Sequence, residues 1–252
     1  MKTTPPDYVL DYVAKYIAGE IVLNNKPGSV IRKWREIYGL SQIDASRLIN
    51  IKPSVLSDYE RDRRRAGRRF IEKFIKTLFI HDSKRGWITT VRIAKLMNIY
   101  VDGIIDIGEF IKPIGLDELI ILTDGILLSN TVIHRPVYGY TIIDSVKAVK
   151  SLTASEYVKL MGSTSDRVVV FTNITRGRSV MVAVRVSPVK PSIVILHNVQ
   201  NVDTLALNIA ILEEIPLIVT NTSIEKIIKR LREKTILRIE MGPRGFEPRT
   251  SA

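Results

Sequence analysis

Residues 31–65, with the sequence IRKWREIYGLSQIDASRLINIKPSVLSDYERDRRR, constrain the fold of this chain more than any other segment. Apolar residues recur there at helical spacing in three short runs separated by turn-forming residues. Gly39 is suited to end the first run in the left-handed conformation, and Asn50 tolerates positive φ at the second turn. Pro53 suits the first turn of a third helix, where its missing N–H is not needed. Three such helices predict a helix-turn-helix unit, which places one helix in the major groove of DNA.

The ends of these helices can also be predicted from side-chain chemistry. Ser29 and Ser41 are candidate N-caps of the first two helices, and Asp44 completes a short capping box with Ser41. The third helix has an apolar inward face, formed by Val55, Leu56 and Tyr59. Its remaining side chains are expected to point outward, and these include Ser54, Ser57 and Asp58.

A cluster of arginines follows the predicted third helix. Six occur within nine residues, at Arg61, Arg63, Arg64, Arg65, Arg68 and Arg69. Because guanidinium groups repel one another, such a cluster needs either an anionic partner or ample solvent. Its place beside a predicted recognition helix favours contact with DNA phosphates, and a solvated charge run is the alternative.

Residues 29–70 resemble the Cro/repressor (XRE-like) type of helix-turn-helix. The matching residues are Arg35, Leu40-Ser41-Gln42, the turn at Asn50-Ile51, and Ser54, Ser57 and Glu60. Roughly residues 15–235 resemble a family of archaeal predicted transcriptional regulators, in which a Cro-type domain precedes a C-terminal domain of unassigned biochemistry. The wider resemblance is carried by PGSVIRKWREIYGLSQ, PSVLSDYERDRRR, YGYTIIDSVKAVKSL, DRVVVFTNITRGRSVMVAVRV and IPLIVTN.

The resemblance implies roles for individual residues. Positions that face base edges are occupied by Lys52, Pro53, Ser54, Ser57 and Asp58. Gln42 is expected to bind a phosphate and brace the third helix, and Arg35 and Glu60 to form an ion pair between helices one and three. Phosphate contacts are further expected from Arg61, Arg63, Arg64, Arg65 and Arg68. For Asp58 two roles stay open, since it either accepts from a cytosine amine or is only solvated.

Two positions depart from the family pattern. Ala45 replaces a larger apolar residue, which should thin the packing under the second helix. Asp62 replaces a glycine just after the third helix. That aspartate puts the local turn in question and adds a negative charge near the expected phosphate path.

Composition agrees with a soluble two-domain protein that has an anionic partner. The chain has 252 residues, 45% of them apolar and 25% charged, and a formal net charge of +12. A nucleic acid is the partner that such a positive charge favours. The sequence contains no cysteine, which excludes disulfides and thiolate metal sites and fits a cytoplasmic location. No uninterrupted apolar run is long enough to suggest a membrane span.

We predict an all-α N-terminal domain followed by an α/β domain with a mixed sheet. Residues 1–82 form the helix-turn-helix domain with an extra helix near residues 7–25, and residues 83–115 connect it to the next domain. Residues 116–238 form the α/β domain, which serves dimerisation or effector binding, and residues 239–252 form a disordered tail.

Within the α/β domain, hydrophobic patterns predict several elements. Strands are predicted at residues 119–128, 193–196 and 217–219, and a β-hairpin at residues 168–186. Helices are predicted at residues 141–151, 155–161, 204–214 and 224–234. The last four elements have the order of a βαβα unit with parallel strands.

No assembled catalytic or metal-binding pattern is visible, so we predict neither an enzyme nor a cofactor. The expected function is a sequence-specific, DNA-binding transcriptional regulator that acts in the cytoplasm as a homodimer on double-stranded DNA. The prediction leaves room for an unidentified small-molecule effector. The alternative is a basal-transcription bridging or coactivator protein that acts mainly through protein contacts and binds DNA weakly, whatever its sequence.

Overall fold

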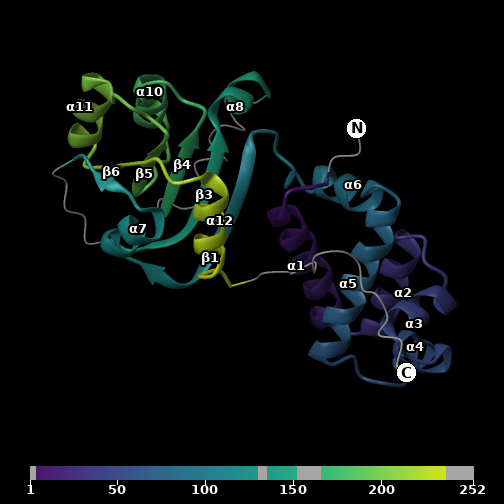
Figure 1. Cartoon of the computed structure of the whole chain (residues 1–252). Helices are drawn as coiled ribbons and strands as arrows, with labels where there is room; N and C mark the ends of the chain where they lie inside the picture. The colour runs from purple at the N-terminus through teal and green to yellow at the C-terminus, as the bar shows by residue number, and fades with distance from the viewer. Residues whose placement is uncertain (1–3, 130–134, 152–165, 237–252) are drawn as a thin grey trace, which may run out of the picture. The chain divides into compact units, whose positions relative to one another are not determined.

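The computed structural model describes residues 4–129, 135–151 and 166–236 and contains two compact units (Figure 1). The first unit ends at Tyr100 and the second begins at Val101. Among the described residues, the first unit is entirely helical and the second combines helices with a mixed sheet. The predicted fold class is therefore confirmed.

The first unit is a bundle of helices. Its described helices are α1 (Asp7–Leu23), α2 (Pro27–Ile37), α3 (Gln42–Ile49), α4 (Pro53–Glu60), α5 (Arg68–Lys84) and α6 (Ile88–Leu96). α1 is the extra N-terminal helix, and it packs on α2, α5 and α6 through an apolar face. α2 begins three residues earlier than predicted, because Pro27 rather than the residue after Ser29 occupies the first helical position.

The prediction that residues 83–115 only connect the two domains is wrong, because a helix and a strand occupy much of this range. Asp82 is fully buried, and its carboxylate accepts hydrogen bonds from the backbone N–H groups of Thr89 (3.1 Å) and Thr90 (2.7 Å). This carboxylate caps α6, which thus belongs to the first unit. A cap supplied from seven residues away leaves no local signal in the sequence.

The second unit is built on a six-stranded sheet with the order β1-β3-β4-β5-β6-β2. Its strands are β1 (Ile104–Ile114), β2 (Ile126–Leu127), β3 (Val137–Asp144), β4 (Arg167–Thr172), β5 (Ile193–His197) and β6 (Leu217–Thr220). β3 to β6 are parallel, and β1 and β2 are antiparallel edge strands. Its described helices are α7 (Leu116–Thr123), α8 (Ser145–Ser151), α10 (Arg178–Val186), α11 (Thr204–Leu212) and α12 (Ile224–Arg232).

Helices cover both faces of this sheet. Successive residues of a strand point to opposite faces, so Val168 and Val170 pack in one cluster with α7 and α12. Val169 and Phe171 pack in a second cluster with α8, α10 and α11. The central strands are consequently buried on both sides, which explains their continuous apolar sequences.

Three predictions for this unit are wrong. The region 119–128 contains α7 and the short strand β2, with a left-handed Asp124 (φ 46°) between them. The predicted helix 141–151 begins only at residue 145, since the preceding residues form the strand β3. The second half of the predicted hairpin is the helix α10. Its many valines favour a strand, but Val180, Met181 and Val184 share one buried helical face, and this packing overrides propensity.

The βαβα unit is present as β5, α11, β6 and α12. The predicted helix 155–161 and the predicted disordered tail 239–252 lie outside the described residues. Among the described residues, no helix has both the length and the apolar character that crossing a membrane requires.

Candidate nucleic-acid interface

α3 and α4 form the two helices of the helix-turn-helix unit. Ser41 caps α3, since its Oγ accepts a hydrogen bond from the backbone N–H of Asp44 at 3.0 Å. Asn50 ends α3 in the left-handed conformation (φ 63°), and Pro53 is the first residue of α4. Local chemistry therefore determines both the turn and the start of α4.

α4 presents one face to the core and another to solvent. Leu56 and Tyr59 are buried, which holds the helix in the first unit. Of the predicted base-facing residues, Lys52, Pro53 and Ser54 are exposed, and Ser57 and Asp58 are half-buried. The N-terminal end of α4 is thus open to a ligand, and contact of these five residues with base edges stays a prediction.

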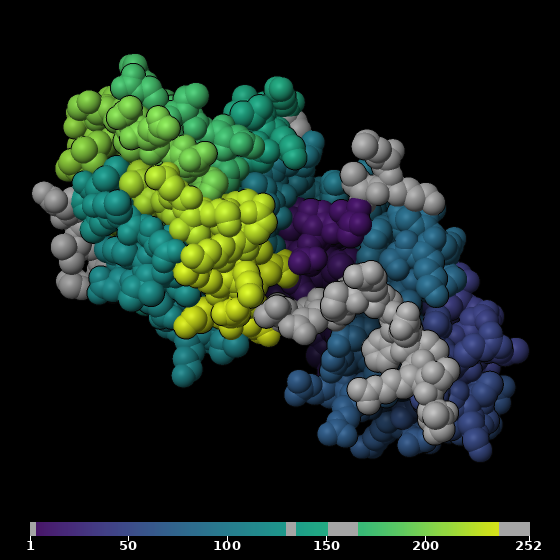
Figure 2. Space-filling model, viewed as in Figure 1, coloured from purple at the N-terminus to yellow at the C-terminus, as the bar shows by residue number. Residues whose placement is uncertain are grey.

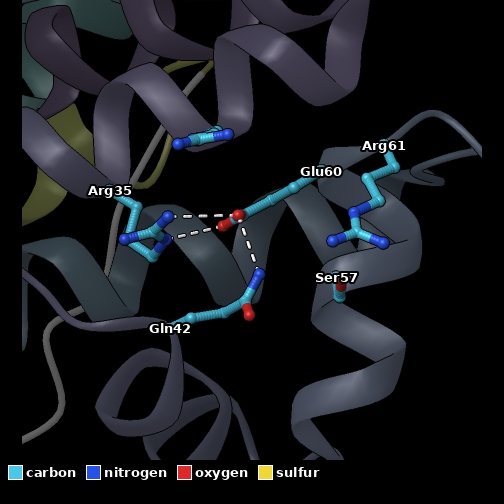
Figure 3. A pocket seen from close by; sticks show the side chains of 6 residues that line it. Arg35, Gln42, Ser57, Glu60 and Arg61 are labelled. Carbon is cyan, nitrogen blue, oxygen red and sulfur yellow. Dashed lines mark hydrogen bonds and ion pairs between the residues drawn. The ribbon is translucent and has the colours of Figure 1, made fainter.

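Arg35 and Glu60 form a buried bidentate ion pair between α2 and α4 (Figure 3). Arg35 Nε lies 2.6 Å from Glu60 Oε1, and Nη2 lies 3.1 Å from Oε2. Arg35 Nη1 also donates to the backbone carbonyl of Leu40 at 2.8 Å. Gln42 Nε2 donates to Glu60 Oε2 at 3.0 Å, so the first residue of α3 joins the same network. These bonds fix the mutual positions of α2, α3 and α4.

A pocket of about 230 Å³ adjoins this network and is lined by Arg32, Arg35, Gln42, Ser57, Glu60 and Arg61. Arg61 and Ser57 lie together on one side of it, across from the ion pair (Figure 3). Arg32 Nε donates to Glu36 Oε1 at 2.8 Å, and this hydrogen bond lowers the pKa of the Glu36 carboxyl. Arg32 was not predicted as a site residue, although its position one helical turn before Arg35 and Glu36 was visible in the sequence. With two exposed guanidinium groups at its rim, the pocket suits an anion such as a phosphate.

The arginine cluster begins where α4 ends. The backbone N–H groups of Arg63 and Arg64 both donate to the carbonyl of Asp58, at 2.9 and 3.2 Å, so the chain turns back along the helix end. Arg64 also lies over the ring of Tyr59, with Cζ 5.3 Å from the centroid. All six arginines of the cluster are exposed, and none forms an ion pair within the part of the chain that the structure describes. This leaves their charges available to an anionic ligand.

Asp62 forms a turn that the sequence had left in question. Its φ of 56° lies in the left-handed region, which explains why relatives are expected to carry glycine there. Its Oδ1 accepts a hydrogen bond from the backbone N–H of Gly28 at 2.7 Å. The aspartate thereby caps α2, which has no local side-chain cap, and its negative charge is partly offset by the helix dipole.

Gly28 is a structural residue of the site that was not predicted, because nothing near it in the sequence marks a close contact. A Cβ atom at this position would lie 2.3 Å from the carbonyl oxygen of Tyr59 and 2.8 Å from the carbonyl carbon of Glu60. The backbone of α2 therefore touches the backbone at the end of α4. Only a residue without a side chain permits this contact.

Comparisons with known proteins agree with this architecture. Residues 31–83 match the family model described as helix-turn-helix. An HTH-type transcriptional regulator of Archaeoglobus fulgidus is 41% identical over 224 residues, which cover 88% of this chain and 97% of that protein. An HTH-type transcriptional regulator of Methanocaldococcus jannaschii is 38% identical over 229 residues, which cover 89% of this chain and 95% of that protein.

A solved structure shows a weaker similarity. It contains the CBS and DRTGG domains of the regulatory region of Clostridium perfringens pyrophosphatase in complex with the activator diadenosine tetraphosphate. The match has a TM-score of 0.38 and 11% identity and covers 58% of this chain and 56% of that one.

Proposed function

The chain belongs to the family of archaeal HTH-type transcriptional regulators and is a DNA-binding regulator, and from this premise we propose that α4 reads base edges sequence-specifically while the arginine cluster binds phosphates. The base-reading residues would be Lys52, Pro53, Ser54, Ser57 and Asp58. The phosphate-binding residues would be Gln42, Arg61, Arg63, Arg64, Arg65 and Arg68. Two copies would act together, because one such module contacts only a few base pairs.

One observation carries this proposal. The exposed end of α4 is followed directly by six exposed arginines without ion-pair partners among the described residues, while a buried network braces the helix from behind. A rigidly supported helix favours specific recognition of bases. If the helix were loosely held, it would have to become ordered on binding, and this would lower the affinity. The bridging alternative explains neither the brace nor the cationic cluster, and the relatives are described as regulators.

Gln42 has two roles in this proposal, one for its side chain and one for its backbone N–H. Its amide N–H₂ is engaged by Glu60, so the side chain braces α4. Its backbone N–H lies in the first turn of α3, where the N–H groups have no intrahelical partner. A phosphate at this helix end would therefore receive backbone donors as well as the favourable end of the helix dipole.

Removing two arginines of the cluster should weaken binding to every duplex. For Arg64→Ala with Arg65→Ala, we expect the slope of log affinity against log salt to become shallower by about two, because about one counterion is released per phosphate contact. Fluorescence anisotropy with a selected and a scrambled duplex, at several salt concentrations, measures both affinities and slopes.

A matched control removes two exposed cations elsewhere in the same unit. Arg92 and Lys95 lie on α6, outside the helix-turn-helix, and their double replacement by alanine changes the net charge equally. This control should leave the salt slope nearly unchanged. Equal slopes for wild type and the Arg64/Arg65 variant would remove these arginines from the interface.

Ser57→Ala should have a different effect, because a base-edge contact carries sequence information. We expect the preference among related duplexes to change by about 1–3 kcal/mol at one base pair, with little change in the salt slope. Selection from a randomised duplex library with wild type and variant reports this difference. An unaltered selected sequence would show that Ser57 does not read a base.

The second unit would serve association of two copies or binding of an effector. Its identity as a dimerisation or effector domain rests on the need for two half-sites and on the place of this unit after the DNA-binding domain. The family is one of regulators, which suggests no enzymatic role.

A further inference from the structure

α11 exposes both large apolar and polar side chains on the side that faces away from the sheet. Ala206, Ile209 and Ala210 are buried against the sheet. On the opposite side, Ile211 and Leu212 are 52% and 63% exposed. Thr204 and Asn208 are the only polar residues of this helix. A helix with this composition is normally covered on both sides, whereas here one side faces solvent.

α10 extends the apolar surface. Val180, Met181 and Val184 face the sheet, while Val182 and Val186 point away from it and are 40% and 76% exposed. α10 packs directly on α11, on the same face of the sheet, and both lie at the surface of the second unit (Figure 2). We call the exposed surface formed by Val182, Val186, Leu205, Ile211 and Leu212 the α10–α11 face.

The helix α12, on the opposite face of the sheet, is organised differently. It buries Ile227 and Leu231 and exposes Glu225, Lys226 and Lys229 to solvent. This amphipathic pattern is what a solvent-covered helix requires. α12 therefore presents charge to solvent, whereas α10 and α11 present several large apolar side chains, and such a patch is typical of a surface that another protein covers.

The charges around the α10–α11 face are divided between its two helices. The charged residues of α10 are the cations Arg178 and Arg185. The charges flanking α11 are all acidic, namely Asp203, Glu213 and Glu214, and Glu213 already pairs within the chain with Lys190 and, at 3.9 Å, with Arg185 of α10. Both helices connect neighbouring parallel strands and so run in the same direction. Arg178 and Asp203 thus lie at one end of the face, and Arg185 and Glu214 at the other.

This division makes the surface complementary to itself. A two-fold axis parallel to the helices would stack α10 of one copy on α11 of the other, with valines against isoleucine and leucine. Each cationic helix would then lie over an acidic one, at both ends of the face. The apolar centre and charged ends have the usual anatomy of a protein interface. A two-fold axis across the helices would instead stack α10 on α10 and juxtapose like charges.

We propose that the α10–α11 face is the isologous interface through which two copies of this chain associate. The choice of a second copy as the occupant rests partly on the proposed function, since paired half-sites need paired DNA-binding domains. The interface itself can be tested without DNA, so the two proposals can fail separately.

The first test places a lysine in the centre of the face. Ile211→Lys should weaken dimerisation at least about tenfold, because the ammonium group must be desolvated on association. Sedimentation velocity of the full chain over a concentration series measures the dissociation constant. The control, Ile121→Lys, changes a residue of α7 that is 72% exposed and lies on the opposite side of the sheet, and it should remain dimeric.

Val186→Lys is a second variant that distinguishes loss of the interface from misfolding. This side chain is already largely exposed, so its replacement should leave thermal unfolding unchanged. It too should dissociate the dimer. A monomeric wild type would overturn the inference, as would dimers that survive both Ile211→Lys and Val186→Lys. A monomer that still selects one DNA sequence would overturn the interface and leave the proposed function standing.

A charge exchange tests the direction of the two-fold axis. Arg185→Glu and Glu214→Lys should each weaken self-association by at least about tenfold, since each creates two repulsive contacts per dimer. An equimolar mixture of the two variants should regain wild-type association, because each new charge then meets its opposite. A mixture that associates no better than the separate variants would overturn the proposed arrangement.

Discussion

Replacing Glu60 with alanine is expected to lower the free energy of unfolding of the first unit by about 3–5 kcal/mol. The variant leaves the Arg35 guanidinium buried without its carboxylate and also removes the acceptor of Gln42 Nε2. Both tryptophans of the chain, Trp34 and Trp87, are buried in this unit, so urea unfolding followed by tryptophan fluorescence reports on it selectively.

Two further variants separate the buried ion pair from ordinary surface charge. Glu36→Ala removes the exposed partner of Arg32, which has only a long contact (3.5 Å) with Arg35 Nη2, and should cost no more than about 0.5 kcal/mol. The double variant Arg35→Met with Glu60→Leu should recover most of the lost stability, since it leaves no uncompensated charge. A loss for Glu60→Ala as small as that for Glu36→Ala would contradict the bracing role of the ion pair.

Gly28→Ala should destabilise the first unit by about 3 kcal/mol, at the upper end of the usual cost of overpacking. The new methyl group would meet the backbone of Tyr59 and Glu60, which cannot move aside as a flexible side chain would. The end of α4 would be displaced from α2, so DNA binding should weaken together with stability. The same tryptophan-monitored urea titration measures the change.

Gly19→Ala is the matched control for this substitution. Gly19 lies inside α1, and a Cβ atom there would have no neighbour within 4 Å. Alanine should therefore stabilise the unit by about 0.5–1 kcal/mol, because it is the better helix former. If both glycines accepted alanine without loss, the close approach of α2 and α4 would not exist in solution.

Local chemistry made the helix-turn-helix predictable. Ser41, Asn50 and Pro53 determine helix ends through their own side chains or backbone preferences, and these short-range effects are visible in sequence. The resemblance to Cro-type domains added the pairing of Arg35 with Glu60, which are 25 residues apart.

The features that were not predicted depend on contacts between residues far apart in the sequence. Asp62 caps α2 across 34 residues, and Asp82 caps a helix beyond the residues that look like a linker. In the second unit, α10 is rich in valine, and β3 runs directly into α8, so propensity misplaced both. Packing against the sheet determines whether these residues form a helix or a strand, and the pattern of a single sequence does not show which residues pack there.

The central claim is that α4 reads DNA sequence while the cationic residues around it bind the backbone. The most direct measurement compares the affinity of the wild-type chain for a duplex selected from a random library with its affinity for a scrambled duplex of equal length, at several salt concentrations. We predict that the selected duplex binds at least about a thousandfold more tightly and that both affinities fall steeply with salt. Equal affinities for the two duplexes at every salt concentration would contradict the account.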